Sequence, residues 1–119
     1  MRDNLVSIVD CFIQQEKINF SLSKDTPFEF WLDDPLETVT VRFKIDAPSK
    51  EIFYDVYSPK YSLHLKEETI DDVKRLEYLA EEHRQWKIAE IIENIWLILD
   101  QIRMWAVKNN FRLIEKNLV

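Results

Sequence analysis

A chain of 119 residues with 46% hydrophobic and 13% aromatic side chains has the size of a single domain, spanning residues 1–119, and is apolar enough to bury a core. Its 22 acidic residues outnumber its 16 basic ones, and the resulting net charge of −6 argues against nucleic acid or an anionic membrane as the main partner. Glycine is absent, which disfavours phosphate-binding loops, dinucleotide-binding turns and the hydrolase nucleophile elbow.

The N-terminal segment 3–15 is predicted to form an amphipathic helix, because its apolar residues recur every three or four positions and Asp3 can cap its start. Cys11, the only cysteine, lies beside the apolar face and is expected to be a small buried hydrophobe. No disulfide can form within the chain, and the N-terminus lacks the pattern of a secretory signal. We therefore expect a reducing, cytoplasmic setting.

Four runs of alternating apolar and polar residues follow, and each predicts a strand with one face in a core and the other toward water. The runs are 18–22, 28–32, 39–45 and 52–56. The short, proline-containing connections between them favour an antiparallel meander over parallel crossovers, which need longer links. A fifth, weaker edge strand is expected at 61–65.

Two consecutive helices are predicted after the meander. Thr69 and Asp72 have the spacing of a capping box, which indicates that a helix begins there. Its apolar stripe, which ends at His83, is rotated by about 110° from the stripe of 88–102, so a bend or break is expected near 84–87. Whether this region is one bent helix or two separate ones stays open.

The second of these helices is expected to end near Lys108. Asn109 or Asn110 can adopt the left-handed conformation that glycine usually supplies at a helix end. The tail that follows fits either an added strand or an ordered coil.

These elements make an α+β domain: an N-terminal helix, an antiparallel meander of four or five strands, and two C-terminal helices packed on one face of the sheet. Residues 57–62, "YSPKYS", follow the strand run. In element order and in this proline–tyrosine segment, the chain resembles ubiquitin-conjugating-enzyme-like domains, including their catalytically inert RWD relatives. No site residue is carried over, because no cysteine follows the meander and Cys11 falls in the first helix.

Residues 88–107 are the most apolar part of the chain. Charged residues within them, such as Glu93 and Asp100, would each cost about 2.5–3.5 kcal/mol at the centre of a bilayer, so a core helix is expected instead of a membrane span. Leu97 and Met104 nevertheless lie opposite the core stripe on a helical wheel, and Trp105 lies on its flank. Either another segment of this chain covers that second apolar face, or another protein chain does.

The acidic residues are concentrated, and 25–37 contain five acids and no base. Trp31 falls on the strand face opposite Phe30 and Leu32, so an aromatic side chain is expected among carboxylates on the polar side of the sheet. Aromatic anchors with charged neighbours are common at protein interfaces. The alternative is that a neighbouring loop covers Trp31.

No catalytic, metal or cofactor site is predicted. His64 and His83 lack the paired spacing of zinc ligands, and the acids near residue 70 are explained by a helix N-terminus, which favours negative charge. We therefore expect a protein that is not an enzyme and that needs no cofactor.

The predicted function is that of a small acidic protein-binding module, such as an inhibitor, immunity or anti-defence protein acting on a basic partner surface. No direct contact with nucleic acid or membrane is expected. The alternative is a structural or adaptor subunit that self-associates, as a homodimer, through its C-terminal helix. The predicted partner-binding residues are Trp31, Asp33, Asp34, Glu37, Leu97, Met104 and Trp105.

Overall fold

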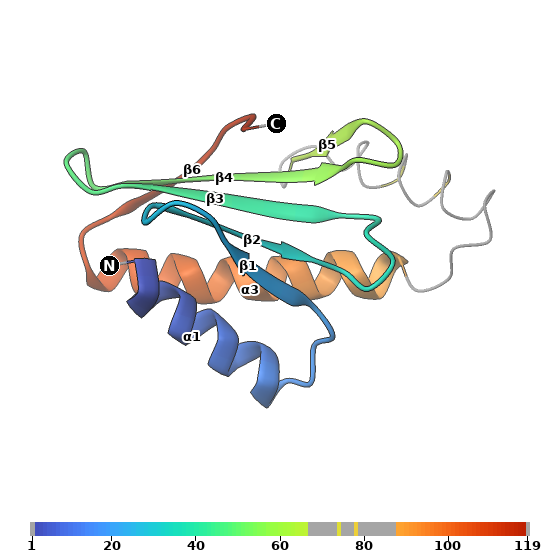
Figure 1. The fold of residues 1–119 in the computed structure, drawn as a ribbon, viewed down its shortest axis with the longest axis horizontal. Helices are drawn as coiled ribbons and strands as arrows, with labels where there is room; N and C mark the ends of the chain where they lie inside the picture. The colour runs from blue at the N-terminus through green and yellow to red at the C-terminus, as the bar shows by residue number, and fades with distance from the viewer. Residues whose placement is uncertain (1, 67–73, 75–77, 79–87, 119) are drawn as a thin grey trace.

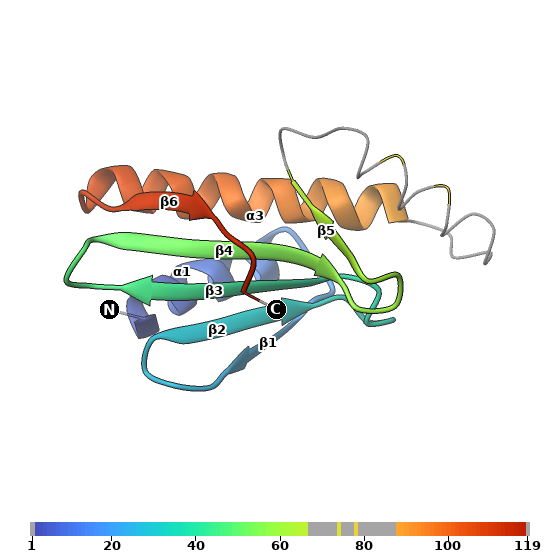
Figure 2. The same ribbon diagram turned by 90° about the horizontal axis from the view of Figure 1, so that it is seen from above.

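The computed structural model describes residues 2–66, 74, 78 and 88–118. The helices and strands are α1 (Arg2–Gln15), β1 (Ser21–Lys24), β2 (Glu29–Asp33), β3 (Thr40–Asp46), β4 (Glu51–Ser58), β5 (Leu63–Leu65), α3 (Ile88–Lys108) and β6 (Arg112–Glu115). Helices α1 and α3 lie side by side on one face of the sheet (Figure 1). The chain beyond β6 turns onto the opposite, outer face (Figure 2).

Strands β1 to β5 pair in chain order, and every pair is antiparallel. Strand β6 is parallel to β4, with Glu51 opposite Arg112 and Tyr54 opposite Glu115. Strand β3 occupies one edge of β4, so β5 and β6 share its other edge: β5 pairs with 56–58 and β6 with 51–54. Strand β4 is therefore hydrogen-bonded on both sides along most of its length.

The α+β class and the N-terminal helix agree with the prediction, but the predicted fold class is wrong in two points. The sheet is not a pure meander, because the described residues form six strands of it and β6 runs parallel to its neighbour β4. The physical reason is that the short β5 leaves half an edge of β4 unpaired, and its backbone groups need partners. Helix α3 brings the tail back along the sheet to supply them.

The second point concerns the helices. One C-terminal helix, α3, stands among the described residues, where two were predicted. The first of the predicted pair, expected from Thr69 to His83, lies outside the described residues except for Lys74 and Tyr78, as does the predicted break at 84–87. The second agrees closely, since α3 ends at Lys108.

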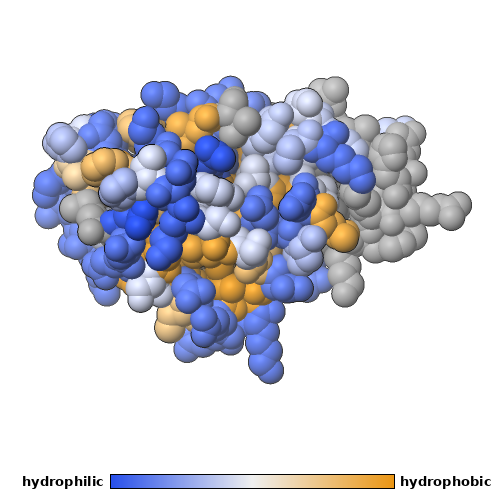
Figure 3. Space-filling view, in the orientation of Figure 1, coloured by the Kyte–Doolittle hydropathy of each residue, from blue (hydrophilic) through white to orange (hydrophobic). Residues whose placement is uncertain are grey.

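The core lies between the sheet and the two helices. Helix α1 contributes Leu5 and Val9, and α3 contributes Leu99 and Ile102, all of which are fully buried. Figure 3 shows that hydrophobic residues also reach the surface between α1 and the sheet. Partly buried residues packed against the core include Ile8 and Phe12 of α1, Leu22 of β1, and Phe20 just before β1. Cys11, in contrast, is exposed and not buried as predicted.

No helix among the described residues is long and apolar enough to cross a membrane. This agrees with the rejection of residues 88–107 as a membrane span.

The end of α3 directs the tail into β6. Asn110 takes a positive φ of 59°, as predicted for one of the two asparagines. The amide of Phe111 then donates to the carbonyl of Ala106 at 2.8 Å, and the Phe111 ring lies 5.4 Å from the Trp105 ring. This backbone bond with its apolar contact is the Schellman arrangement that terminates many helices.

Candidate functional site

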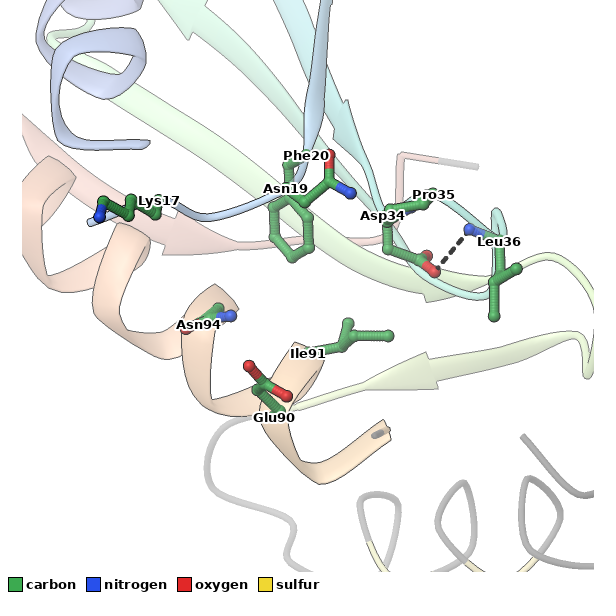
Figure 4. A pocket seen from close by; sticks show the side chains of 9 residues that line it. All are labelled: Lys17, Asn19, Phe20, Asp34, Pro35, Leu36, Glu90, Ile91 and Asn94. Carbon is green, nitrogen blue, oxygen red and sulfur yellow. Dashed lines mark hydrogen bonds between the residues drawn. The ribbon is translucent and has the colours of Figure 1, made fainter. Parts of the chain in front are cut away.

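A cleft of about 310 Å³ lies where three segments meet. They are the residues after α1 (17–20), the β2–β3 hairpin loop (34–36) and the first turns of α3 (90–94). Figure 4 shows these side chains grouped around one opening. A volume of this size accommodates one or two side chains and stands at the lower end of the range for ligand pockets.

The wall of the cleft is apolar where the three segments approach one another. Phe20 and Ile91 are partly buried and pack against the core, so their positions are fixed from below. Leu36 is 64% exposed at the tip of the hairpin loop (Figure 4). A single exposed leucine is ordinary, but this one extends the apolar surface of Phe20 and Ile91.

Asp34 holds the hairpin loop in shape. Its side chain is 2% exposed, and its two carboxylate oxygens accept the amides of Val39 at 2.7 Å and Leu36 at 3.2 Å. Glu37 follows with a positive φ of 54° and donates its amide to the Asp34 carbonyl. Asp34 thus presents Leu36 to the cleft, and its carboxylate is already used by the loop.

The rim of the cleft is polar. Helix α3 contributes the exposed carboxylate of Glu90 and the amide of Asn94, while Lys17 and Asn19 stand on the other side (Figure 4). Among the described lining residues, Glu90 supplies the exposed carboxylate and Lys17 the ammonium group, because the Asp34 carboxylate is turned into its own loop. On the α3 side of the cleft, a group with an apolar stem and a positive end fits these surroundings best.

The structure does not bring the predicted residues Trp31 and Asp34 onto one surface. Trp31 and Asp33 lie on the outer face of β2, opposite the buried Phe30 and Leu32, and both are partly buried. Arg42, from the neighbouring strand β3, stacks its guanidinium 4.9 Å from the centre of the Trp31 ring. A cation from the neighbouring strand thus lies over the indole ring.

The predicted partner-binding residues of α3 do not lie on one surface either. Trp105 is 7% exposed and packs against Phe111, so it belongs to the core. Leu97 and Met104 are 42% and 58% exposed, on the side of the helix that faces away from the sheet. These two side chains remain at the surface, together with Val107.

Sequence reasoning missed the apolar wall of the cleft. The one available signal was Leu36, a large apolar residue inside the acidic turn "DDPLE". It also missed the buried Asp55, which is 3% exposed and accepts hydrogen bonds from the Leu118 amide and from His64 Nδ1 as the donor, both at 2.8 Å. Asp55 ties the tail and β5 to the outer face of β4.

The described residues contain no group of three or more His, Cys, Asp or Glu side chains that could hold a metal ion. The chain matches no family model, no curated protein and no solved structure. The similarity in element order to ubiquitin-conjugating-enzyme-like domains therefore has no support from such a match, and the function has to be inferred from the geometry of the chain itself.

Proposed function

We propose that this protein is a non-enzymatic binding module that receives a lysine or arginine side chain of a partner protein in the cleft. The observation that carries the proposal is the combination, within about 310 Å³, of an apolar wall with the Glu90 carboxylate and the Asn94 amide on the α3 side of the rim. The stem of the incoming side chain packs against Phe20, Leu36 and Ile91. Its cationic end pairs with Glu90 and donates a hydrogen bond to the side-chain carbonyl oxygen of Asn94.

Two further properties support a binding role over a catalytic one. Among the described residues, the lining of the cleft contains no histidine, cysteine or serine that could serve as a base or nucleophile. Its buried carboxylate, Asp34, already accepts two backbone amides and is committed to the loop. A cytoplasmic inhibitor, immunity or anti-defence protein that acts on a basic surface is the class we propose, and the net charge of −6 would speed its encounter with such a surface.

The proposal is tested by capturing the partner from the source cell and measuring its affinity for cleft variants. Leu36→Ser and Glu90→Gln should each weaken binding about 10-fold, because each removes one component of the pocket. The control is Phe28→Ser, which removes an exposed apolar side chain that is part of neither the cleft nor α3. If both cleft variants bound the partner with the affinity of the wild type, the cleft would be excluded as the binding site.

A second measurement isolates the cationic side chain. If the recognised residue is an arginine, it is replaced in a partner peptide by citrulline, its neutral analogue; if it is a lysine, it is acetylated. The modified peptide should bind about 10-fold more weakly than the native one. The amide signals of residues 17–20, 34–36 and 90–94 should shift on adding the native peptide. Shifts confined to other parts of the molecule would contradict the proposal.

A further inference from the structure

Helix α3 exposes a continuous stripe along the side that faces away from the sheet. On a helical wheel, all of its members fall within about 100° of one another. All are exposed, and none of them belongs to the core. This outward stripe consists of Glu90, Glu93, Leu97, Asp100, Met104, Val107 and Lys108.

The outward stripe contains three large apolar side chains, with Asp100 between the first two. Leu97, Met104 and Val107 are 42%, 58% and 75% exposed, and they follow one another at intervals of seven and three residues on one helix face. A shallow hollow of about 480 Å³ lies beside Met104 and Val107, with Arg103 on its border. Neighbouring large apolar side chains of this kind mark contact surfaces more often than scattered ones do.

The charges of the outward stripe are separated along the helix. Glu90 and Glu93 stand at its N-terminal end, and Lys108 stands at its C-terminal end with Arg103 on the flank. A second copy of the same helix in antiparallel orientation would place acids beside bases at both ends. A parallel copy would place acids beside acids, which is unfavourable.

The spacing also fits a two-fold axis. Leu97 and Met104 are equidistant from a point between residues 100 and 101, and so are Glu93 and Lys108. A two-fold axis at that point pairs Leu97 of one copy with Met104 of the other, and Glu93 with Lys108. Asp100 would lie close to the axis, where its charge is offset by an ion pair of 2.9 Å with Arg103 of its own chain.

We propose that the outward stripe is a homodimer interface at which two α3 helices pack antiparallel around this axis. The occupant of the surface is a second copy of this chain. Glu90 belongs to the outward stripe and also lines the cleft, but the residues paired across the axis, Glu93 with Lys108 and Leu97 with Met104, do not line it, so the inference does not depend on the cleft.

Sedimentation or light scattering over about 1 µM to 1 mM measures the dimerisation constant directly. Glu93→Lys and Lys108→Glu should each weaken dimerisation about 10-fold, because each places like charges together at both ends of the interface. The double variant restores the opposite pairing and should dimerise like the wild type. A wild type that stays monomeric at the highest concentration, or a double variant as weak as the single ones, would overturn the proposal.

Disulfide trapping tests the orientation of the two helices. In a Cys11→Ser background, Asp100→Cys should form a cross-linked dimer on mild oxidation, because the two sulfurs meet near the axis. Glu93→Cys is the matched control, since two copies of residue 93 lie about 22 Å apart along an antiparallel pair at 1.5 Å per residue. Cross-linking of Glu93→Cys as fast as that of Asp100→Cys would instead indicate a parallel arrangement and overturn the proposal.

Discussion

Within the part of the chain that the structure describes, five residues with side chains occupy backbone conformations that proteins usually give to glycine. They have φ values between 51° and 59° and lie at helix ends and in turns: Lys17, Glu37, Lys50, Ser62 and Asn110. Each of these conformations brings the Cβ atom close to the backbone, at a cost of roughly 1–2 kcal/mol for an ordinary residue. A chain without glycine therefore folds with this strain distributed over its turns.

Replacing one of these residues by glycine should stabilise the protein. We expect Lys17→Gly, at the end of α1, to raise the free energy of unfolding by about 1 kcal/mol, after allowing for the extra freedom of glycine in the unfolded chain. The melting temperature should rise by about 4 °C. The control is Lys44→Gly, an exposed lysine within β3, which should lower the melting temperature. A decrease for Lys17→Gly would show that its positive φ is not strained.

A surface ion pair at the start of α1 gives a pH-dependent prediction. The Arg2 guanidinium donates to Asp3 Oδ1 at 2.9 Å and also to the Thr26 carbonyl, and it lowers the pKa of Asp3 below its ordinary value of 3.8. A carboxyl with a lowered pKa in the folded state stabilises that state above the unfolded pKa. The contribution is lost as pH falls through the lower, folded pKa.

The Arg2→Gln variant should therefore titrate Asp3 at a higher pH than the wild type does. NMR titration of the Asp3 carboxyl carbon measures the pKa. Below about pH 4, the free energy of unfolding of the variant should fall less steeply with decreasing pH than that of the wild type. Lys108→Gln removes a positive charge from the other helix and should leave the pKa of Asp3 unchanged. An unshifted Asp3 in Arg2→Gln would show that the ion pair is absent in solution.

At the scale of elements, the junction between α3 and β6 depends on one aromatic side chain. Phe111 is 7% exposed and packs on Trp105, so Phe111→Ala should cost about 3 kcal/mol in the free energy of unfolding. Arg112→Ala, one residue further on, loses only an exposed ion pair of 2.9 Å with Glu51 and should cost less than about 1 kcal/mol. Chemical denaturation measures both, and equal losses would contradict the role of Phe111.

The elements that the sequence predicted well are those with a long periodic pattern. In helices α1 and α3 apolar residues recur every three or four positions, and in strands β2 to β4 apolar and polar residues alternate. These patterns are clear enough to identify both the element and its buried face. Strand β6 could not be assigned, because four residues carry too little pattern and because its partner, β4, lies about 60 residues earlier in the chain. Parallel pairing of this kind depends on where α3 brings the tail, which no local signal specifies.

The candidate site was less predictable than the fold. The cleft joins residues near positions 18, 35 and 91, and only Asp34 among them was a predicted partner-binding residue. Exposed Leu97 and Met104 followed from the helical wheel, whereas Trp105 lay close enough to the core stripe to be buried. Periodicity identifies the face of an element, but a cleft between elements depends on how the elements pack.

The whole molecule is organised around β4. On one edge it is paired with β3, and on the other with β5 and β6, so that local hairpins and the distant C-terminal tail meet on the same strand. Strand β1, in contrast, forms an outer edge of the sheet, and its four residues are exposed or partly buried. Stability should therefore decrease across the sheet from β4 to β1.

Hydrogen exchange at individual backbone amides tests this gradient. Amides that β4 donates to its neighbours should exchange only when the whole domain unfolds, whereas those of β1 should exchange through local opening, at least about 100-fold faster. Phe111→Ala should accelerate exchange in β4, because it weakens the anchoring of β6, and should leave β1 nearly unchanged. If β1 and β4 exchanged at one common rate, the domain would open as a single unit, and the tail would not stabilise the sheet locally.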